Sequence, residues 1–241
     1  MAKAPTNNQR SKTPRPARPK QLRLEDMIKI SPLSDAQQKA FDEWKSGKNL
    51  ILGGSAGTGK TFISMHIAIS EVLDKSTPYE KVIVCRSAVP VRDMGFLPGT
   101  AEEKEMVYTL PYKGIVSDIF DKSMAWDKLI VCGKAEFLTT SYLRGITLDN
   151  SIVIVDEMQN CNMQELDSII TRCGQDTRII FAGDYYQSDF RSDKDKNGIL
   201  HFLNVVTQMS QFSAVQFTWE DIVRSSLVKD YIMIKEKNDR D

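Results

Sequence analysis

Eight consecutive residues have the types and spacing of a phosphate-binding loop. The segment from Gly54 to Thr61 reads GSAGTGKT and fits the pattern GxxxxGK[ST]. Its glycines let the backbone curl so that successive N–H groups point at phosphate oxygens. We expect Lys60 to reach the β- and γ-phosphates of a nucleotide and the Thr61 hydroxyl to bind Mg²⁺. The alternative is a chance glycine-rich turn. The expected nucleotide-binding residues are Gly54, Ser55, Ala56, Gly57, Thr58, Gly59, Lys60 and Thr61.

Two acidic residues, Asp156 and Glu157, follow the apolar run from Ser151 to Val155. Asp156 is suited to hold Mg²⁺ through the water shell that this small, hard ion retains. Glu157 is suited to act as a general base on an attacking water. Alone, the pair could be a charge pair at a helix N-terminus. Beside a phosphate loop it favours hydrolysis, because a small-molecule kinase has no use for an activated water.

A third motif, GDYYQ, follows the apolar run from 177 to 182 and ends at Gln187. A glutamine can both donate and accept hydrogen bonds, so Gln187 could sense the γ-phosphate or orient the water. The motif is weak evidence on its own, because a Gly-Asp turn after a strand is common.

The elements that must position these residues alternate between short apolar strands and helical patterns. We expect strands at 49–53, 81–85, 136–140, 151–155, 177–182 and 214–217. We expect helices at 33–47, 60–73, 101–110, 112–123, 163–173, 198–209 and 220–235. Such alternation predicts an α/β fold with one parallel sheet and helices on both faces. Continuously apolar strands fit a sheet that is buried on both sides, with ligands at the carboxyl ends of its strands.

The charge of the chain is unevenly spread along its 241 residues. Basic and acidic side chains number 32 each, but seven basic and no acidic ones lie in the first 23 residues. The rest of the chain, residues 24–241, has 25 basic and 32 acidic side chains and is therefore acidic. We therefore expect a disordered basic tail over residues 1–23 and one folded domain over residues 24–241. The tail is either an arm that binds nucleic-acid phosphates or a solvated terminus with no partner.

Nothing in the composition indicates secretion or a membrane. No apolar run approaches 18 residues, and the N-terminus lacks the apolar segment of a signal peptide. No pair of the four cysteines is spaced as CxxC, which argues against a structural zinc site. We expect a cytoplasmic protein with free thiols and no membrane partner.

Taken together, the motifs resemble the PhoH family of P-loop ATPases, which is related to the RecA-like core of superfamily 1 helicases. The resemblance spans about Leu33 to Lys235, and GFLPG at 95–99 followed by EEK at 102–104 is its most specific part. The chain departs from the family at Ser87, where proline is usual, and at Met158, where alanine is usual. Arg92-Asp93 also replaces a Gly-Glu pair. None of these departures removes a catalytic group.

The resemblance implies a P-loop NTPase with a single RecA-like sheet that hydrolyses ATP with Mg²⁺ and acts on or with nucleic acid, with RNA favoured. It implies that Gln37 reads adenine, although Gln37 could instead be a polar residue on an amphipathic helix. It also implies that Gln187 senses the γ-phosphate and that Arg224 is an arginine finger. Further candidates for a phosphate contact are Arg86, Arg144 and Arg172, each of which could instead form a surface salt bridge.

A single lobe must close its ATP site with a neighbouring subunit, so we expect a homo-oligomer, by family resemblance a hexameric ring. The alternative function is a nucleotide-dependent binding or assembly module with little or no turnover. The intact Asp156-Glu157 pair argues against this alternative. A small-molecule kinase is disfavoured by the same pair and by Gln187.

Overall fold

A six-stranded parallel sheet forms the centre of the computed structural model, which describes residues 21–87, 101–143, 145–184 and 193–238. Its strand order is β3-β2-β4-β5-β1-β6, and every neighbouring pair is parallel. The strands are β1 (Asn49–Gly54), β2 (Lys81–Arg86), β3 (Ala135–Thr139), β4 (Ser151–Val155), β5 (Arg178–Gly183) and β6 (Phe212–Phe217). The predicted α/β fold with a single parallel sheet is confirmed, and the six predicted strands are shifted by at most two residues at either end.

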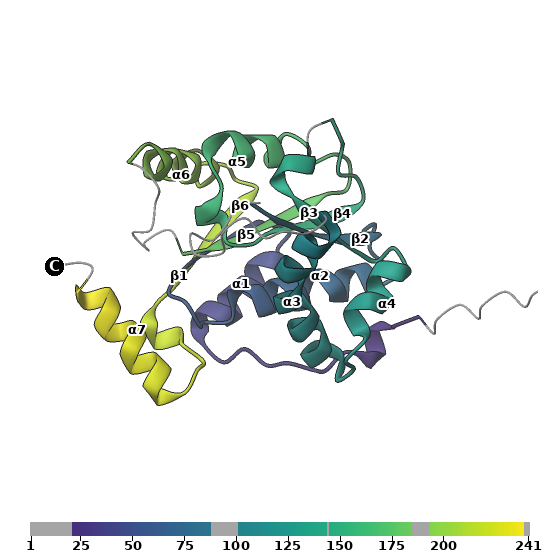
Figure 1. Cartoon of the computed structure of the whole chain (residues 1–241), viewed down its shortest axis with the longest axis horizontal. Coiled ribbons are helices and arrows are strands. Elements are labelled where there is room, and N and C mark those ends of the chain that lie inside the picture. Colours follow the sequence, from purple (N-terminus) through teal and green to yellow (C-terminus); the bar gives the residue numbers. More distant parts are fainter. Residues whose placement is uncertain (1–20, 88–100, 144, 185–192, 239–241) are drawn as a thin grey trace, which may run out of the picture.

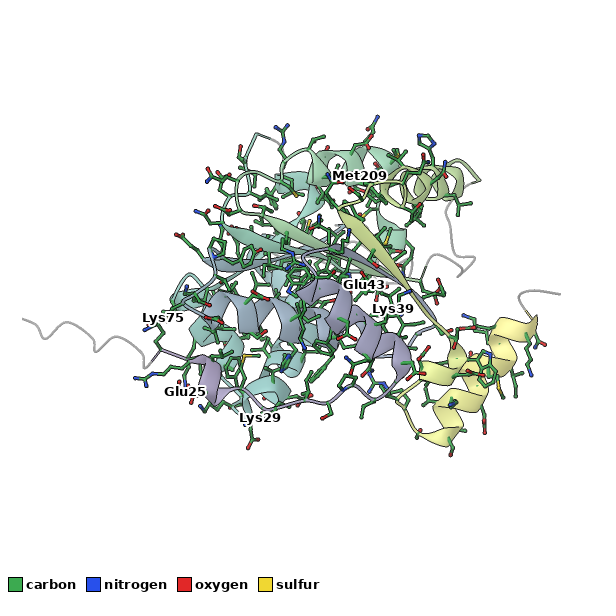
Figure 2. The ribbon with its side chains drawn as sticks, turned by 180° about the vertical axis from the view of Figure 1, so that it is seen from behind. Glu25, Lys29, Lys39, Glu43, Lys75 and Met209 are labelled. Atoms are coloured by element: carbon green, nitrogen blue, oxygen red, sulfur yellow. The ribbon has the colours of Figure 1, made fainter. Side chains whose placement is uncertain are left out.

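Helices cover both faces of this sheet (Figure 1). One face packs against α1 (Asp35–Lys45), α2 (Lys60–Leu73), α3 (Ala101–Phe120) and α4 (Ala125–Val131). The other face packs against α5 (Met163–Ile170) and α6 (Asp193–Val206). Figure 2, seen from behind, shows side chains filling the space between the sheet and the helices on both faces.

The four inner strands are largely apolar because each one contributes side chains to two cores. In β4, Ile152 and Ile154 belong to the core beneath α2, whereas Val153 and Val155 belong to the core beneath α5 and α6. Side chains that alternate between two buried faces must be apolar or have a hydrogen-bond partner, as the Ser151 hydroxyl has in Asp149 O. This is why β4 reads SIVIV, with all five residues buried.

Proline 111 lies inside α3, so the two helices expected at 101–110 and 112–123 are one continuous helix. Proline lacks the N–H group that a helix interior needs, which is why the sequence pattern predicted a break. Burial of Tyr112, Val116 and Ile119, at helical spacing, anchors the second half of α3 in the core. Burial of this half of α3 outweighs the tendency of proline to break a helix. The short helix α4 was not predicted at all.

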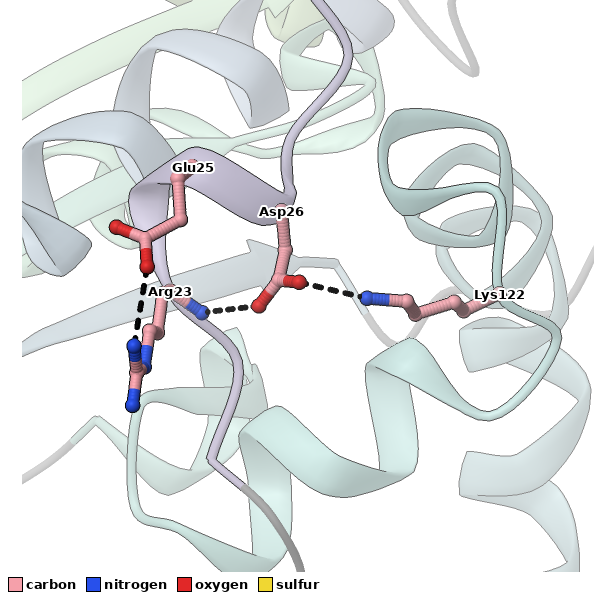
Figure 3. Close-up of polar contacts among 4 residues, drawn as sticks. All are labelled: Arg23, Glu25, Asp26 and Lys122. Carbon is pink, nitrogen blue, oxygen red and sulfur yellow. Dashed lines mark hydrogen bonds and ion pairs between the residues drawn. The ribbon is translucent and has the colours of Figure 1, made fainter.

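The N-terminal segment packs from Leu22 onward, inside the range that the sequence assigned to the tail. Leu22 is buried, and Arg23 precedes a short 3-10 turn at Leu24–Asp26. Figure 3 shows the Arg23 backbone N–H donating to Asp26, which also pairs with Lys122 at 2.9 Å. Such partly exposed ion pairs contribute about 0–1 kcal/mol, so the burial of Leu22 is the stronger anchor.

Helix α7 (Ser226–Asn238) stands apart from both helix layers, and none of its residues is buried (Figure 1). It begins six residues later than predicted, because residues 219–221 form a separate 3-10 turn. That turn is capped by Thr218, whose hydroxyl accepts from the Glu220 backbone N–H. Figure 2 places Glu25 and Lys29 on the side of the molecule remote from this helix. Among the described helices, none is long and apolar enough to cross a membrane.

Candidate nucleotide site

The GSAGTGKT loop connects the carboxyl end of β1 to the first residue of α2, as the motif requires. Gly54 has a φ of 119°, and a Cβ atom there would collide with the carbonyl oxygen of Phe217 on β6. That same oxygen accepts a hydrogen bond from the Ser55 N–H at 3.2 Å. Only glycine therefore allows β6 to approach the loop this closely.

The loop is held in a tight curve by its own side chains. The Thr58 hydroxyl donates to Ser55 O at 3.0 Å, and the Lys60 ammonium donates to Gly54 O and Ser55 O at 2.7 Å each. Gly59 precedes α2 in a left-handed conformation, with φ 84°. The loop and the N-terminus of a 14-residue helix thus meet at one point, where backbone N–H groups and the helix dipole favour an anion.

Lys60 is half-buried, and burial lowers the pKa of its ammonium group. The nearby carboxylates of Asp184, Glu157 and Asp156 act in the opposite direction and favour the charged form. These three acids follow the ends of β4 and β5. The carboxyl ends of β1, β5 and β4, which are adjacent in the sheet, therefore form one polar cluster around Lys60.

Thr61 and Asp156 meet across this cluster. The Thr61 hydroxyl donates to Asp156 Oδ1 at 2.9 Å, and the hydroxyl of Tyr112 donates to Oδ2 at 2.8 Å. Burial and the charge of Glu157 raise the pKa of the Asp156 carboxyl, and both hydroxyl groups oppose that rise. Burial also raises the pKa of the Tyr112 phenol, so this hydroxyl keeps its proton and acts as a donor.

The donor set fits Mg²⁺ better than a metal held wholly by protein. In the described part of the chain, no group of three or more His, Cys, Asp or Glu side chains could hold a metal ion. Mg²⁺ binds through one or two protein oxygens, substrate phosphates and water. One threonine hydroxyl and one carboxylate beside a phosphate loop satisfy that requirement.

Glu157 adopts a left-handed backbone conformation with φ 51°, which is costly for a residue that is neither Gly, Asn nor Asp. Such strain costs about 1–3 kcal/mol and is concentrated at functional sites. The Gln159 amide donates to Glu157 Oε2 at 2.6 Å, and its oxygen accepts from the Asp184 N–H at 3.1 Å. Gln159 therefore holds Glu157 against the end of β5. The sequence pattern assigned no role to Gln159, although its position two residues after Glu157 was visible.

Gln37 lies at the loop, where its side chain already has two partners. It donates to Thr58 O at 3.0 Å and accepts from the Leu33 N–H at 2.8 Å. Its predicted helix cap is present, because the Ser34 hydroxyl accepts from the Gln37 N–H at 3.3 Å. The carboxamide thus links the N-terminal segment to the loop. Contact with an adenine base stays a prediction.

Arg224 lies beside the loop of its own chain. The Val223 N–H donates to Gly57 O at 3.1 Å, and Arg224 Cγ lies 3.1 Å from where a Cβ on Gly57 would be. Arg172 is elsewhere: its carbonyl accepts from the Leu148 N–H, in the chain that leads into β4. Arg172 is therefore near the amino end of the sheet, opposite the loop.

Of the remaining residues predicted to contact phosphate, the structure describes only one, Arg86. The Arg86 guanidinium lies 5.9 Å from the centre of the Tyr108 ring, and its charge lowers the pKa of Asp156. Arg86 is thus on the phosphate side of the sheet. Gln187 and Arg144 fall outside the described residues.

Comparison with known proteins identifies the family. The family described as PhoH-like protein matches residues 29–236, which is most of the chain. The chain belongs to the PhoH-like protein family. Protein PhoH of Escherichia coli is 31% identical over 204 residues, or 84% of this chain and 57% of that protein. The PhoH-like protein of Bacillus subtilis is 31% identical over 191 residues, or 78% and 59% of the two chains. This PhoH-like chain spans little more than half the length of these curated relatives.

Solved structures resemble the chain more distantly. A large terminase from a thermophilic bacteriophage has 16% identity and a TM-score of 0.47, over 83% of this chain and 50% of the terminase. The Pif1 protein of Bacteroides, solved with single-stranded DNA, has 16% identity and a TM-score of 0.40, over 78% and 42% of the two chains. At these TM-scores the likenesses add nothing to the family assignment.

We predict that replacing Gln37 with alanine weakens nucleotide binding about tenfold and lowers the free energy of unfolding by about 1–3 kcal/mol, because the buried Thr58 carbonyl loses its donor. Urea denaturation and binding of ATP and GTP measure the two effects. If Gln37 also reads adenine, ATP should lose more affinity than GTP. Gln38→Ala, which removes only an exposed hydrogen bond to Asp42, is the matched control. Unchanged binding in Gln37→Ala would contradict the prediction.

Proposed function

We propose that the protein is an ATPase that uses Mg²⁺ and couples hydrolysis to action on nucleic acid. The observation that carries this proposal is the 2.9 Å hydrogen bond between Thr61 of the phosphate loop and Asp156 at the end of β4. It brings a phosphate cradle and a carboxylate into the arrangement that a metal–nucleotide complex needs. Glu157 is the next residue along the chain, so a general base lies beside that complex.

In this proposal each group has a separate task. The loop N–H groups and Lys60 stabilise the phosphates, and Thr61 and Asp156 would hold Mg²⁺. Mg²⁺ supplies charge neutralisation on the phosphate oxygens. Glu157, fixed by Gln159, accepts the proton of the attacking water. Gln187 remains the proposed sensor of the γ-phosphate, and Arg224 the proposed arginine that stabilises charge on the transferring group.

The strain at Glu157 favours this proposal over a binding module without turnover. A module that only binds nucleotide needs the loop and the metal ligand. It has no use for a glutamate with a backbone φ of 51° whose carboxylate accepts a hydrogen bond from a neighbouring amide. Strain of this kind persists only where the surrounding structure maintains it. Measurement of phosphate release distinguishes the ATPase from the binding module.

Replacing Glu157 with glutamine should reduce steady-state phosphate release from ATP by about 100-fold or more, because an amide is not a general base. ATP binding should persist, since the loop, Lys60 and Asp156 are unchanged. Phosphate release and equilibrium ATP binding are the two measurements. Lys60→Ala should lose both.

The matched control is Glu80→Gln, the same chemical change at an exposed position just before β2 and far from the loop. It should hydrolyse ATP at the wild-type rate. If Glu157→Gln also hydrolyses ATP normally, Glu157 is not the base. A wild-type protein that binds ATP but releases no phosphate would favour the binding module.

The proposed nucleic-acid partner rests on the basic N-terminal residues and on family resemblance, with RNA favoured. Six basic and no acidic side chains lie in residues 1–20. Their neutralisation of phosphates would release counterions and make binding depend on salt. The phosphate loop needs no such excess of positive charge, because backbone N–H groups provide most of its contacts.

Deletion of residues 1–20 should separate the two activities. Basal ATP hydrolysis should survive, whereas RNA affinity should fall and the slope of log affinity against log salt should shrink by up to about 4, at roughly 0.7 per charge. The cut stops before Leu22, which packs in the core. ATPase assays with RNA, single-stranded DNA and duplex DNA measure the coupling. Equal RNA binding by both proteins would refute the role of the tail.

We also propose that the site is completed by a second copy of the chain. Leu227, Tyr231 and Ile234 line one side of α7 and are 78%, 68% and 56% exposed. An apolar stripe at this spacing is suited to contact another subunit. Arg172 lies at the amino end of the sheet, so only a neighbouring chain could bring it to the loop, whereas Arg224 lies beside the loop of its own chain. A hexameric ring remains the proposed assembly.

A mixing experiment tests which arginine acts between chains. Inactive Arg172→Ala and inactive Glu157→Gln chains, once mixed, should regain activity, because some sites then combine an intact Glu157 with a neighbour's Arg172. Arg224→Ala and Glu157→Gln mixtures should not regain it.

In light scattering, Leu227→Asp should shift the mass toward the monomer, while Lys235→Asp on the same helix should not. A wild-type protein that is monomeric with and without ATP would overturn the proposal.

A further inference from the structure

Tyr112 is the second hydrogen-bond donor to the carboxylate of Asp156. Its hydroxyl lies 2.8 Å from Oδ2, whereas Thr61 donates to Oδ1 at 2.9 Å. The two donors come from different elements, α3 and α2. In the described part of the chain, Tyr112 is the one donor to Oδ2. The orientation of the carboxylate is therefore fixed from both sides.

The position of the tyrosine hydroxyl is itself set by packing. The Tyr112 side chain is fully buried, and its ring lies 6.2 Å from Trp126 of α4 and 5.9 Å from Phe137 of β3, measured between ring centres. Aromatic rings at this separation attract one another and restrict each other's movement. The hydroxyl therefore reaches Asp156 from a fixed point rather than from a mobile side chain.

A buried tyrosine can also be a purely structural residue whose hydroxyl has simply found a partner. The partner in this case is the carboxylate that we assign to Mg²⁺. Groups that hydrogen-bond to metal ligands set their orientation, and removing them typically weakens metal binding 10- to 100-fold. With Oδ2 engaged by Tyr112, Oδ1 remains directed at Thr61 and the phosphate loop.

We propose that Tyr112 is a positioning residue that orients the Asp156 carboxylate for binding of the divalent cation. This inference rests on the proposed Mg²⁺-dependent ATPase. It predicts a selective defect: removal of the hydroxyl should weaken cation binding while leaving the affinity for the nucleotide without metal unchanged. A tyrosine that only stabilises the fold would weaken both or neither.

The test uses the full chain and Tyr112→Phe, which keeps the ring and its packing. Mn²⁺ binding in the presence of ADP is followed by electron paramagnetic resonance, and ADP binding is measured separately in EDTA. The expected result is an increase of about tenfold in the Mn²⁺ dissociation constant. The ADP affinity in EDTA should remain within about twofold of the wild type. The Mg²⁺ concentration for half-maximal phosphate release should rise in parallel.

Tyr108→Phe is the matched control, since Tyr108 lies one turn earlier in α3 and stands over Arg86. It should leave Mn²⁺ binding unchanged. If Tyr112→Phe does not fold, Phe137→Leu keeps the hydroxyl but loosens the ring, and the same selective loss is expected. Wild-type Mn²⁺ binding in Tyr112→Phe, or an equal loss of Mn²⁺ and ADP binding, would overturn the inference. Wild-type protein that binds neither ADP nor Mn²⁺ would instead overturn the proposed function.

Discussion

The hydrogen bond between Thr61 and Asp156 joins two parts of the chain that are 95 residues apart. Thr61 is in the first turn of α2, and Asp156 follows β4, with the end of β5 between them in the sheet. The bond forms only if β1, β5 and β4 are in register and α2 begins at Lys60. The continuous apolar strands and the close contact of Gly54 with Phe217 both serve that geometry.

Much of this arrangement could be predicted from the sequence, because its signals are local. β4 reads as an unbroken apolar run, and Ser34 is a visible helix cap. The chemistry of the loop depends on residues that are adjacent in the chain. The family assignment drawn from these motifs is confirmed by the match over residues 29–236.

The rest depended on contacts between distant residues, which leave no local pattern. Tyr112 looks like an ordinary core residue until the fold brings its hydroxyl to Asp156, 44 residues away. Gln159 acquires a role only because β5 ends beside it. The family resemblance marks Arg224 as an arginine finger and Arg172 only as a further candidate, but the sequence does not say which of them reaches the loop within one chain. The fold places them at opposite ends of the sheet. The break predicted at Pro111 was wrong because packing outweighed the local preference.

The proline in α3 has a mechanical consequence. Because Pro111 has no N–H, the carbonyl of Val107 receives no hydrogen bond from the helix position that would normally supply it. Bending at this point breaks fewer hydrogen bonds than bending elsewhere in the helix. Tyr112 and the residues one and two turns after it are buried in the core. Before the proline, Met106 and Leu110 are exposed, but Thr109 is buried and Tyr108 packs against the same core. Tyr112, the donor to Asp156, therefore lies directly after the position where bending costs least, and core packing on both sides of Pro111 keeps its hydroxyl in place.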